Sequence, residues 1–119
     1  MQPISYRKKQ VQEMLFKVIV TSLHSKLADQ RLRDVSVTKI KLNDSSTSAR
    51  IYFSISADDS EQNKKDILKV LKKAKGKLRH IIAKTCELRI VPELHFHYDD
   101  TKHKATRVDE LLAQLRNRT

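Results

Sequence analysis

The side chains of this sequence that could bind a metal ion are histidines and one cysteine. His95 and His97 lie two residues apart in a segment that alternates like a strand, so both imidazoles share one face. His80, Cys86 and His103 could complete a zinc site with them. No Cys-x-x-Cys or His-Glu-x-x-His spacing accompanies the pair, however. Exposed polar residues on an alternating strand are the simpler explanation, and we expect no metal ion and no other cofactor.

Groups that could catalyse a reaction are also few. Asp99 and Asp100 lie near a histidine, as acid–base catalysis would need, but adjacent carboxylates at a strand end usually close a turn. Gly76-Lys77 lacks the preceding glycine and the following serine or threonine of a phosphate-binding loop. Cys86 follows an apolar helical face, so we expect it to be packed rather than reactive. The sequence therefore predicts a binding protein and not an enzyme.

Positive charge is concentrated in one stretch of the chain. Between Lys64 and Lys84 there are nine lysines and arginines and a single acid, Asp66, in a chain whose formal net charge is +11. At about 100° per residue, cationic and apolar side chains fall on opposite sides of a helix. The cationic side holds Lys65, Lys69, Lys72, Gly76 and Arg79, flanked by Lys73, Lys75 and Lys77. We interpret these residues as a binding surface for a polyanion, and for RNA in particular.

Gly76 is the only glycine of the chain and lies within this basic stretch. The apolar stripe passes through it in phase, yet glycine costs a helix about 1 kcal/mol relative to alanine. One explanation is a kink or a cap between two helices, which glycine permits because it has no Cβ. The other is that a phosphate backbone comes close to the peptide at this point. We favour both together over a kink alone.

A smaller basic cluster, Arg7-Lys8-Lys9, lies near the N-terminus. It could be a secondary RNA contact, although a solvated start of a helix explains it equally well. Aromatic residues make up only 5% of the chain, which argues against platforms that stack bases and favours recognition of the nucleic-acid backbone or shape.

Hydrophobic periodicity predicts the elements that must position these residues. Apolar residues recur at spacings of three and four from Ser5 to about Leu27, which indicates a long helix. Residues 35–42 and 49–55 read as two strands joined by a turn, and hence as an antiparallel hairpin. Ser60 is the expected N-cap of the basic helical stretch, and residues 88–98 form a third strand. Pro92 in that strand indicates an edge strand or a bulge.

Composition limits the class of protein. A chain of 119 residues with 39% hydrophobic and 33% charged residues is long enough for one domain with a single core. The single cysteine excludes an intramolecular disulfide, and no apolar run approaches the roughly 20 residues that span a bilayer. We expect a cytoplasmic monomer without membrane contact. Residues 1–100 should form the RNA-binding domain and residues 101–119 a C-terminal extension, helical from about residue 106.

The element order helix, strand, strand, helical stretch, strand resembles that of a type II KH domain, an α+β fold that binds single-stranded nucleic acid. The usual Gly-x-x-Gly loop is replaced by Ala74-Lys75-Gly76, which Leu78-Arg79 and Leu88-Arg89 follow. Pro92-Glu93-Leu94 then precedes Phe96 and Asp99. These motifs are similar to those of the ribosome-binding factor A family, with a kinked helix pair and a short C-terminal helix, over most of the chain. The short C-terminus departs from the longer basic tail of many members.

The resemblance implies a biological role. It implies a factor that binds the small ribosomal subunit and its rRNA during late assembly, and that supports 5′-end processing of this rRNA and growth in the cold. Ala74, Lys75 and Gly76 would form the kink, with the adjacent lysines facing RNA. The alternative is a protein-interaction module that docks on ribosomal proteins without recognising RNA. Salt separates the two, because phosphate contacts weaken steeply with salt and an apolar protein interface does not.

Overall fold

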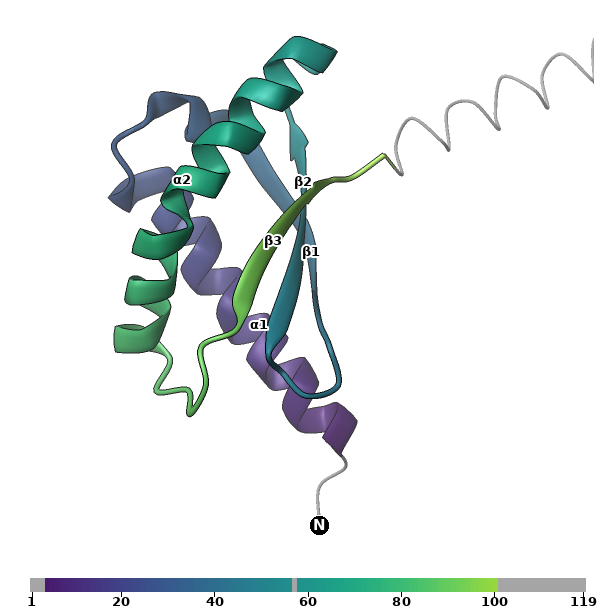
Figure 1. Ribbon diagram of the computed structural model, residues 1–119, viewed down its shortest axis with the longest axis vertical. Helices are drawn as coiled ribbons and strands as arrows, with labels where there is room; N and C mark the ends of the chain where they lie inside the picture. Colours follow the sequence, from purple (N-terminus) through teal and green to yellow (C-terminus); the bar gives the residue numbers. More distant parts are fainter. Residues whose placement is uncertain (1–3, 57, 101–119) are drawn as a thin grey trace, which may run out of the picture.

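A computed structural model describes residues 4–56 and 58–100 of the chain, with side chains from Arg7 onward. The helices and strands follow one another along the chain as shown in Figure 1. They are α1 (Ile4–Thr21), a π-helical turn η1 (Ser22–Lys26), a 3-10 helix η2 (Gln30–Asp34), β1 (Val35–Leu42), β2 (Ser48–Ile55), α2 (Glu61–Thr85) and β3 (Glu93–Tyr98). The predicted C-terminal extension lies outside the described residues. The predicted α+β fold class is confirmed.

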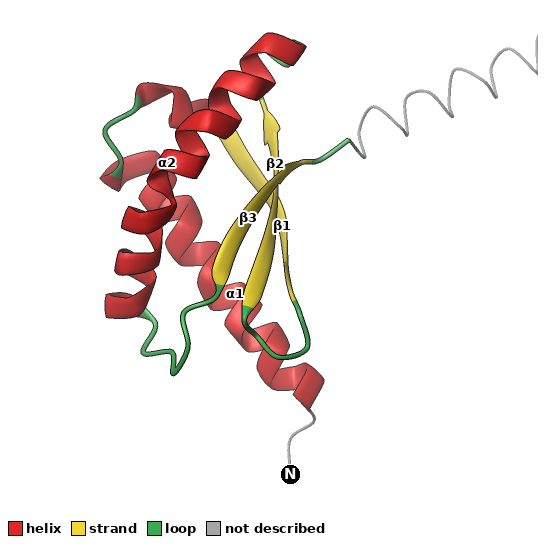
Figure 2. Cartoon of the chain, viewed as in Figure 1, coloured by secondary structure: helices red, strands yellow, loops and turns green. Residues whose placement is uncertain are grey.

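The three strands form one sheet in the order β1-β2-β3, which places β3 at an edge as Pro92 predicted. β1 and β2 pair as the expected antiparallel hairpin, whereas β3 runs parallel to β2. The hairpin turn is closed by the Asn43 side chain, whose Oδ1 accepts hydrogen bonds from the backbone amides of Thr47 and Ser48. α2 is the connection between β2 and β3, as a parallel pair requires a crossover (Figure 2).

A β-bulge interrupts the pairing of β1 between Val37 and Lys39. A strand alternates its side chains between two faces, so an extra residue exchanges the faces. The apolar side chains on both sides of the bulge therefore turn toward the core: Val35 and Val37 before it, Ile40 and Leu42 after it. Within each pair the residues are two apart, but Ile40 follows Val37 by three. The bulge is visible in the sequence, because the apolar residues shift from odd to even positions after Val37. The predicted strand did not take this shift into account.

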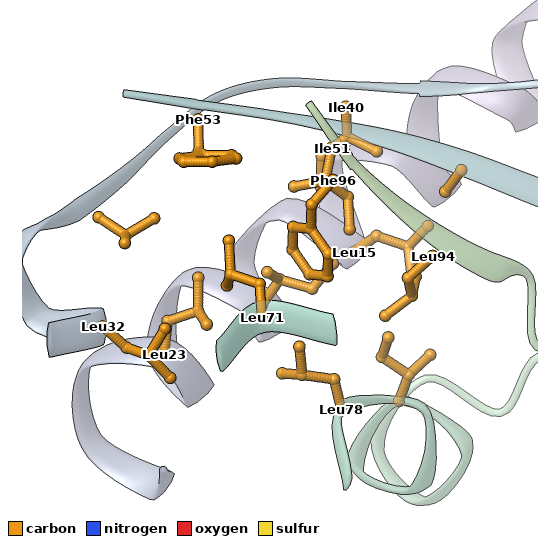
Figure 3. Packing of buried hydrophobic residues seen from close by; sticks show 14 of the residues in the cluster. Leu15, Leu23, Leu32, Ile40, Ile51, Phe53, Leu71, Leu78, Leu94 and Phe96 are labelled. Atoms are coloured by element: carbon orange, nitrogen blue, oxygen red, sulfur yellow. The ribbon is translucent and has the colours of Figure 1, made fainter. Parts of the chain in front are cut away.

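The core lies between one face of the sheet and the two long helices. Figure 3 shows side chains from the strands meeting side chains from helical segments in a single apolar layer. Phe53, Ile51, Leu15 and Leu71 are fully buried there. Burying a large apolar side chain stabilises a fold by roughly 1.5–3 kcal/mol, so this layer fixes the helices on the sheet. Side chains on the opposite face of the sheet are left outside the core.

The structure corrects two predicted elements. The basic stretch is one continuous helix through Ala74, Lys75 and Gly76, so the predicted pair of helices is wrong. Figure 1 shows that this single helix is bent, with its axis changing direction near the middle of α2. The third strand begins only at Glu93, not at Leu88, because Pro92 has no N–H to donate; the first ladder bond runs from the Glu93 amide to the Thr47 carbonyl, at 2.9 Å.

Candidate nucleic-acid interface

Capping residues fix where α2 begins. The Ser60 hydroxyl accepts a hydrogen bond from the Asn63 amide, and the Asp58 carboxylate accepts one from the amide of Ser60 itself. This confirms Ser60 as the N-cap. Glu61 in the first turn and Lys84 in the last also suit the helix dipole. The inward face holds Ile67, Leu71, Leu78 and Ile82, all buried. With that face anchored, the cationic side of α2 must point to solvent.

The outward side of α2 carries six lysines around one glycine, and we call these residues the basic face. They are Lys65, Lys69, Lys72, Lys73, Lys75, Gly76 and Lys77. Lys75 is half-buried and the others are exposed. Within the described part of the chain, none of the six lysines forms a hydrogen bond or an ion pair with an acidic group. No acidic group of residues 7–56 and 58–100 pairs with these charges, so the described surface has a positive potential that attracts anions.

Gly76 lies in the middle of the basic face. Its φ is not positive, and a Cβ added to it would meet no atom within 4 Å. Neither backbone conformation nor packing inside the described domain therefore requires glycine here. Gly76 lies within a helix that is bent, and an exposed peptide without a side chain would also allow a partner to approach the helix closely.

Two cations of the basic stretch make contacts within the domain. The Arg79 guanidinium donates a hydrogen bond of 3.1 Å to the carbonyl of Val91 and so ties α2 to the loop before β3. Lys64 turns toward the sheet, where its Nζ lies 3.2 Å from Glu61 Oε1 and 4.2 Å from the centre of the Tyr98 ring. Desolvation alone would lower the pKa of Lys64, but the hydrogen bond and charge of Glu61, together with the charges of Tyr98 and Asp100, outweigh it and the pKa is raised. Arg79 was predicted as an RNA contact, and its exposed side chain has this structural contact as well.

A groove of about 280 Å³ runs beside the basic face, between α2 and the segment that joins η1 to η2. Lys73, Lys77 and Arg31 line it together with apolar side chains such as Leu27 and Val70. Arg31 bonds to the Asp29 carboxylate through Nε at 3.1 Å and through its terminal nitrogen at 2.9 Å. These bonds and the Arg31 amide lower the pKa of Asp29. The sequence prediction missed Arg31, because only the fold brings η2 next to α2.

The N-terminal cluster lies in a different place. Arg7 and Lys8 line a groove of about 530 Å³ where the start of α1 meets the hairpin turn and the loop before β3, and Arg89 lies there too. The Lys8 ammonium is 3.4 Å from the exposed carboxylate of Asp44. Lys9 is exposed and does not line this groove. The structure thus places Arg7 and Lys8, two of the three predicted residues, in the same groove as Arg89. The sequence had not indicated that Arg89 lies near this cluster.

The remaining candidate residues are the histidines, Cys86 and the two aspartates that follow β3. Across residues 7–56 and 58–100, no three histidine, cysteine, aspartate or glutamate side chains come together as metal ligands. Asp99 accepts a hydrogen bond from the Thr38 hydroxyl. Cys86 is buried, as expected, and this burial raises the pKa of its thiol. Neither α1 nor α2 is long and apolar enough to cross a membrane.

Comparison with known proteins identifies similar chains. A family model described as ribosome-binding factor A matches residues 7–112. Ribosome-binding factor A of Coxiella burnetii is 31% identical over 109 residues, which cover 92% of this chain and 89% of that one. The factor of Hydrogenovibrio crunogenus is 36% identical over 97 residues, covering 81% and 80% of the two chains.

Solved structures share the fold. The solution NMR structure of a Thermotoga maritima protein, described as a ribosome binding factor A, is 28% identical with a TM-score of 0.67 and covers 82% of this chain and 90% of that one. A homology model of the Thermus thermophilus factor, fitted into a cryo-EM map of a complex with the 30S subunit, gives a TM-score of 0.61 at 20% identity. It covers 74% of this chain and 90% of that one, and at this identity the likeness concerns the fold alone.

Proposed function

Because the chain belongs to the ribosome-binding factor A family, we propose that it binds the small ribosomal subunit and contacts its rRNA through the basic face of α2. The observation that carries this proposal is the set of six exposed or half-exposed lysines with no acidic partner in the described domain. The complex of the Thermus thermophilus factor with the 30S subunit supports the choice of partner.

The chemistry of the basic face suits an RNA backbone. Lysine ammonium groups bind phosphates as mobile point charges and release counterions, so they supply affinity without reading sequence. Gly76 would let one phosphate approach the helix itself, and the groove beside Lys73 and Lys77 adds apolar surface next to the charges. Discrimination between RNA states then depends on the shape of the RNA.

The proposal extends to the biological role. A factor that binds one conformation of small-subunit rRNA stabilises it late in assembly and makes its 5′ end accessible to processing. Misfolded RNA rearranges more slowly in the cold, where such help matters most. We further propose that the protein acts as a cytoplasmic monomer without catalysis or membrane contact, and that residues 1–100 form the RNA-binding unit, with 101–119 as an extension.

Gradient sedimentation of cell extracts tests the proposal. The wild-type protein should travel with small subunits, preferring immature ones, and leave when the large subunit joins. A variant with Lys69→Glu and Lys72→Glu should remain at the top of the gradient. A matched control with Lys17→Glu and Lys26→Glu makes the same charge change at exposed positions on α1 and η1 and should still cosediment.

Two results would contradict the proposal. Equal loss of binding in both variants would mean that net charge, and not the basic face, governs association. Cosedimentation that persists in Lys69→Glu/Lys72→Glu and resists high salt would instead indicate docking on ribosomal proteins.

A further inference from the structure

The sheet has one face that no described helix covers. Helices α1 and α2 pack on the other face, where Ala49, Ile51 and Phe53 are buried. Between these residues on β2, Arg50 and Tyr52 project from the uncovered face, Arg50 exposed and Tyr52 half-buried. This open sheet face lies across the sheet from the helical layer to which α2 belongs, so it is distinct from the basic face.

Strand register aligns its side chains in two rows. One row runs from Lys41 through Arg50 to His95, and the other from Lys39 through Tyr52 to His97. All six residues are exposed except the half-buried Tyr52. Each row therefore begins with lysine on β1 and ends with histidine on β3, although the three segments are far apart in the sequence.

The second row forms an aromatic surface beside a cation. The ring centres of Tyr52 and His97 are 5.7 Å apart with an interplanar angle of 33°, and Lys39 Nζ lies 4.6 Å from the centre of the Tyr52 ring. The lysine side chain is exposed and can move aside. An exposed cation–π contact is weaker than the stacking of a base on a tyrosine ring, so an arriving base can replace the ammonium group and leave it to bind a phosphate.

The charge and polarity of the open sheet face select the kind of partner. Its two rows contain three permanent cations, and two acids lie at the margins of the face: Glu93 at the start of β3, whose Oε2 is 3.8 Å from His95 Nε2, and Asp99 just after β3, which accepts a hydrogen bond from the Thr38 hydroxyl. The large hydrophobic side chains that are exposed on the described domain are Met14, Phe16 and Ile90, and none belongs to this face. Such a surface lacks the apolar centre of a protein interface but has the cations and rings that bind single-stranded RNA.

We propose that the open sheet face binds a second segment of single-stranded RNA, with a base stacked on Tyr52 and phosphates held by Lys41 and Arg50. The inference rests on the proposed RNA-binding function but uses a different surface. The remaining chain, 101–119, carries more basic than acidic residues, so its charge does not complement this face. An RNA strand does.

Fluorescence anisotropy with two labelled probes tests the proposal: a decamer of uridine and a decamer with the same backbone but no bases. Tyr52→Ala should weaken binding of the uridine decamer about tenfold and leave the abasic decamer unaffected, because only bases stack. Tyr52→Phe keeps the ring and should bind like the wild type. The double variant Lys41→Glu/Arg50→Glu should weaken binding of both probes. It provides a second test if Tyr52→Ala does not fold.

The same titrations in the Lys69→Glu/Lys72→Glu background separate this inference from the proposed function. The tenfold effect of Tyr52→Ala should persist there. Unchanged RNA affinity in both Tyr52→Ala and Lys41→Glu/Arg50→Glu would refute RNA binding by the open sheet face. It would not contradict the RNA binding proposed for the basic face. A wild-type dimer that Tyr52→Ala dissociates, with RNA affinity unchanged, would show a self-association surface and would equally refute the proposal.

Discussion

At the scale of single residues, Gly76 shows how structure changes the meaning of a sequence signal. The sequence indicated a break between two helices, but the glycine lies in a continuous helix with open space where a Cβ would be. Local stability alone would therefore favour alanine at this position. The cost of keeping glycine is consistent with a role in contact with a partner.

Replacing Gly76 by alanine should raise the free energy of unfolding by up to about 1 kcal/mol, because alanine is the better helix former and its Cβ meets no neighbour. The same change should weaken RNA binding, since the methyl group separates the helix from the phosphate. Urea unfolding and RNA titration measure the two effects. A more stable protein with full RNA affinity would rule out the close approach.

The Cys86 thiol should react slowly with a disulfide reagent at pH 8. It is only 6% exposed, and burial raises its pKa, so little reactive thiolate forms in the folded state. Modification should proceed roughly a hundredfold faster in denaturing urea. Because the unfolded thiol ionises more readily, this group also makes the fold less stable as the pH rises past about 9, its ordinary pKa. Equal rates in the two conditions would show that the thiol is accessible.

At the scale of elements, α2 carries the basic face, and its N-cap residue Ser60 allows a test of what stabilises this helix. Ser60→Ala removes the acceptor of the Asn63 amide and should cost about 1 kcal/mol, or roughly 4–8 °C in melting temperature. Ser60→Asn keeps a capping oxygen and should melt near the wild-type temperature. Similar melting of both variants at the wild-type temperature would mean that the cap contributes nothing measurable.

The basic face should make RNA binding strongly dependent on salt. If it neutralises about four phosphates of single-stranded RNA, the plot of log affinity against log salt concentration should have a slope near −3. The Lys69→Glu/Lys72→Glu variant should have a shallower slope, and the Lys17→Glu/Lys26→Glu control should keep that of the wild type. A slope near zero in the wild type would exclude phosphate binding as the source of affinity.

At the scale of the whole molecule, the fold presents two cationic surfaces in different directions. The sheet and helices form two layers, so the basic face belongs to the helical layer and the open sheet face to the other (Figure 3). A small domain of this shape can contact two RNA segments at once and so favour the rRNA conformation that brings them together. This arrangement gives the proposed preference for one assembly state a physical basis.

Cells that lack the protein should accumulate small-subunit rRNA with an untrimmed 5′ end, most at low temperature, where RNA rearranges slowly. Mapping of 5′ ends in a deletion strain grown warm and cold measures this. Expression of the wild-type chain should restore trimming, and the Lys69→Glu/Lys72→Glu chain should not. Normal ends in the cold-grown deletion strain would contradict a role in rRNA maturation.

The sequence by itself determined the features that depend on local order. Helical periodicity separated the lysines of α2 from its buried face, Ser60 marked where the helix begins, and the hairpin followed from two alternating segments and a turn. The element order and the motif around Ala74-Lys75-Gly76 were sufficient to predict the fold class and the family. Each of these signals is contained in a short window of residues or in their succession.

Only the tertiary structure decided which distant residues meet. The parallel pairing of β3 with β2, the bulge in β1 and the position of η2 beside α2 all depend on contacts between remote segments. The low aromatic content of the sequence argued against a base-stacking surface, but composition does not show where the few rings lie. Strand register places the ring of Tyr52 beside that of His97. Pairing across strands is a non-local interaction that periodicity cannot encode.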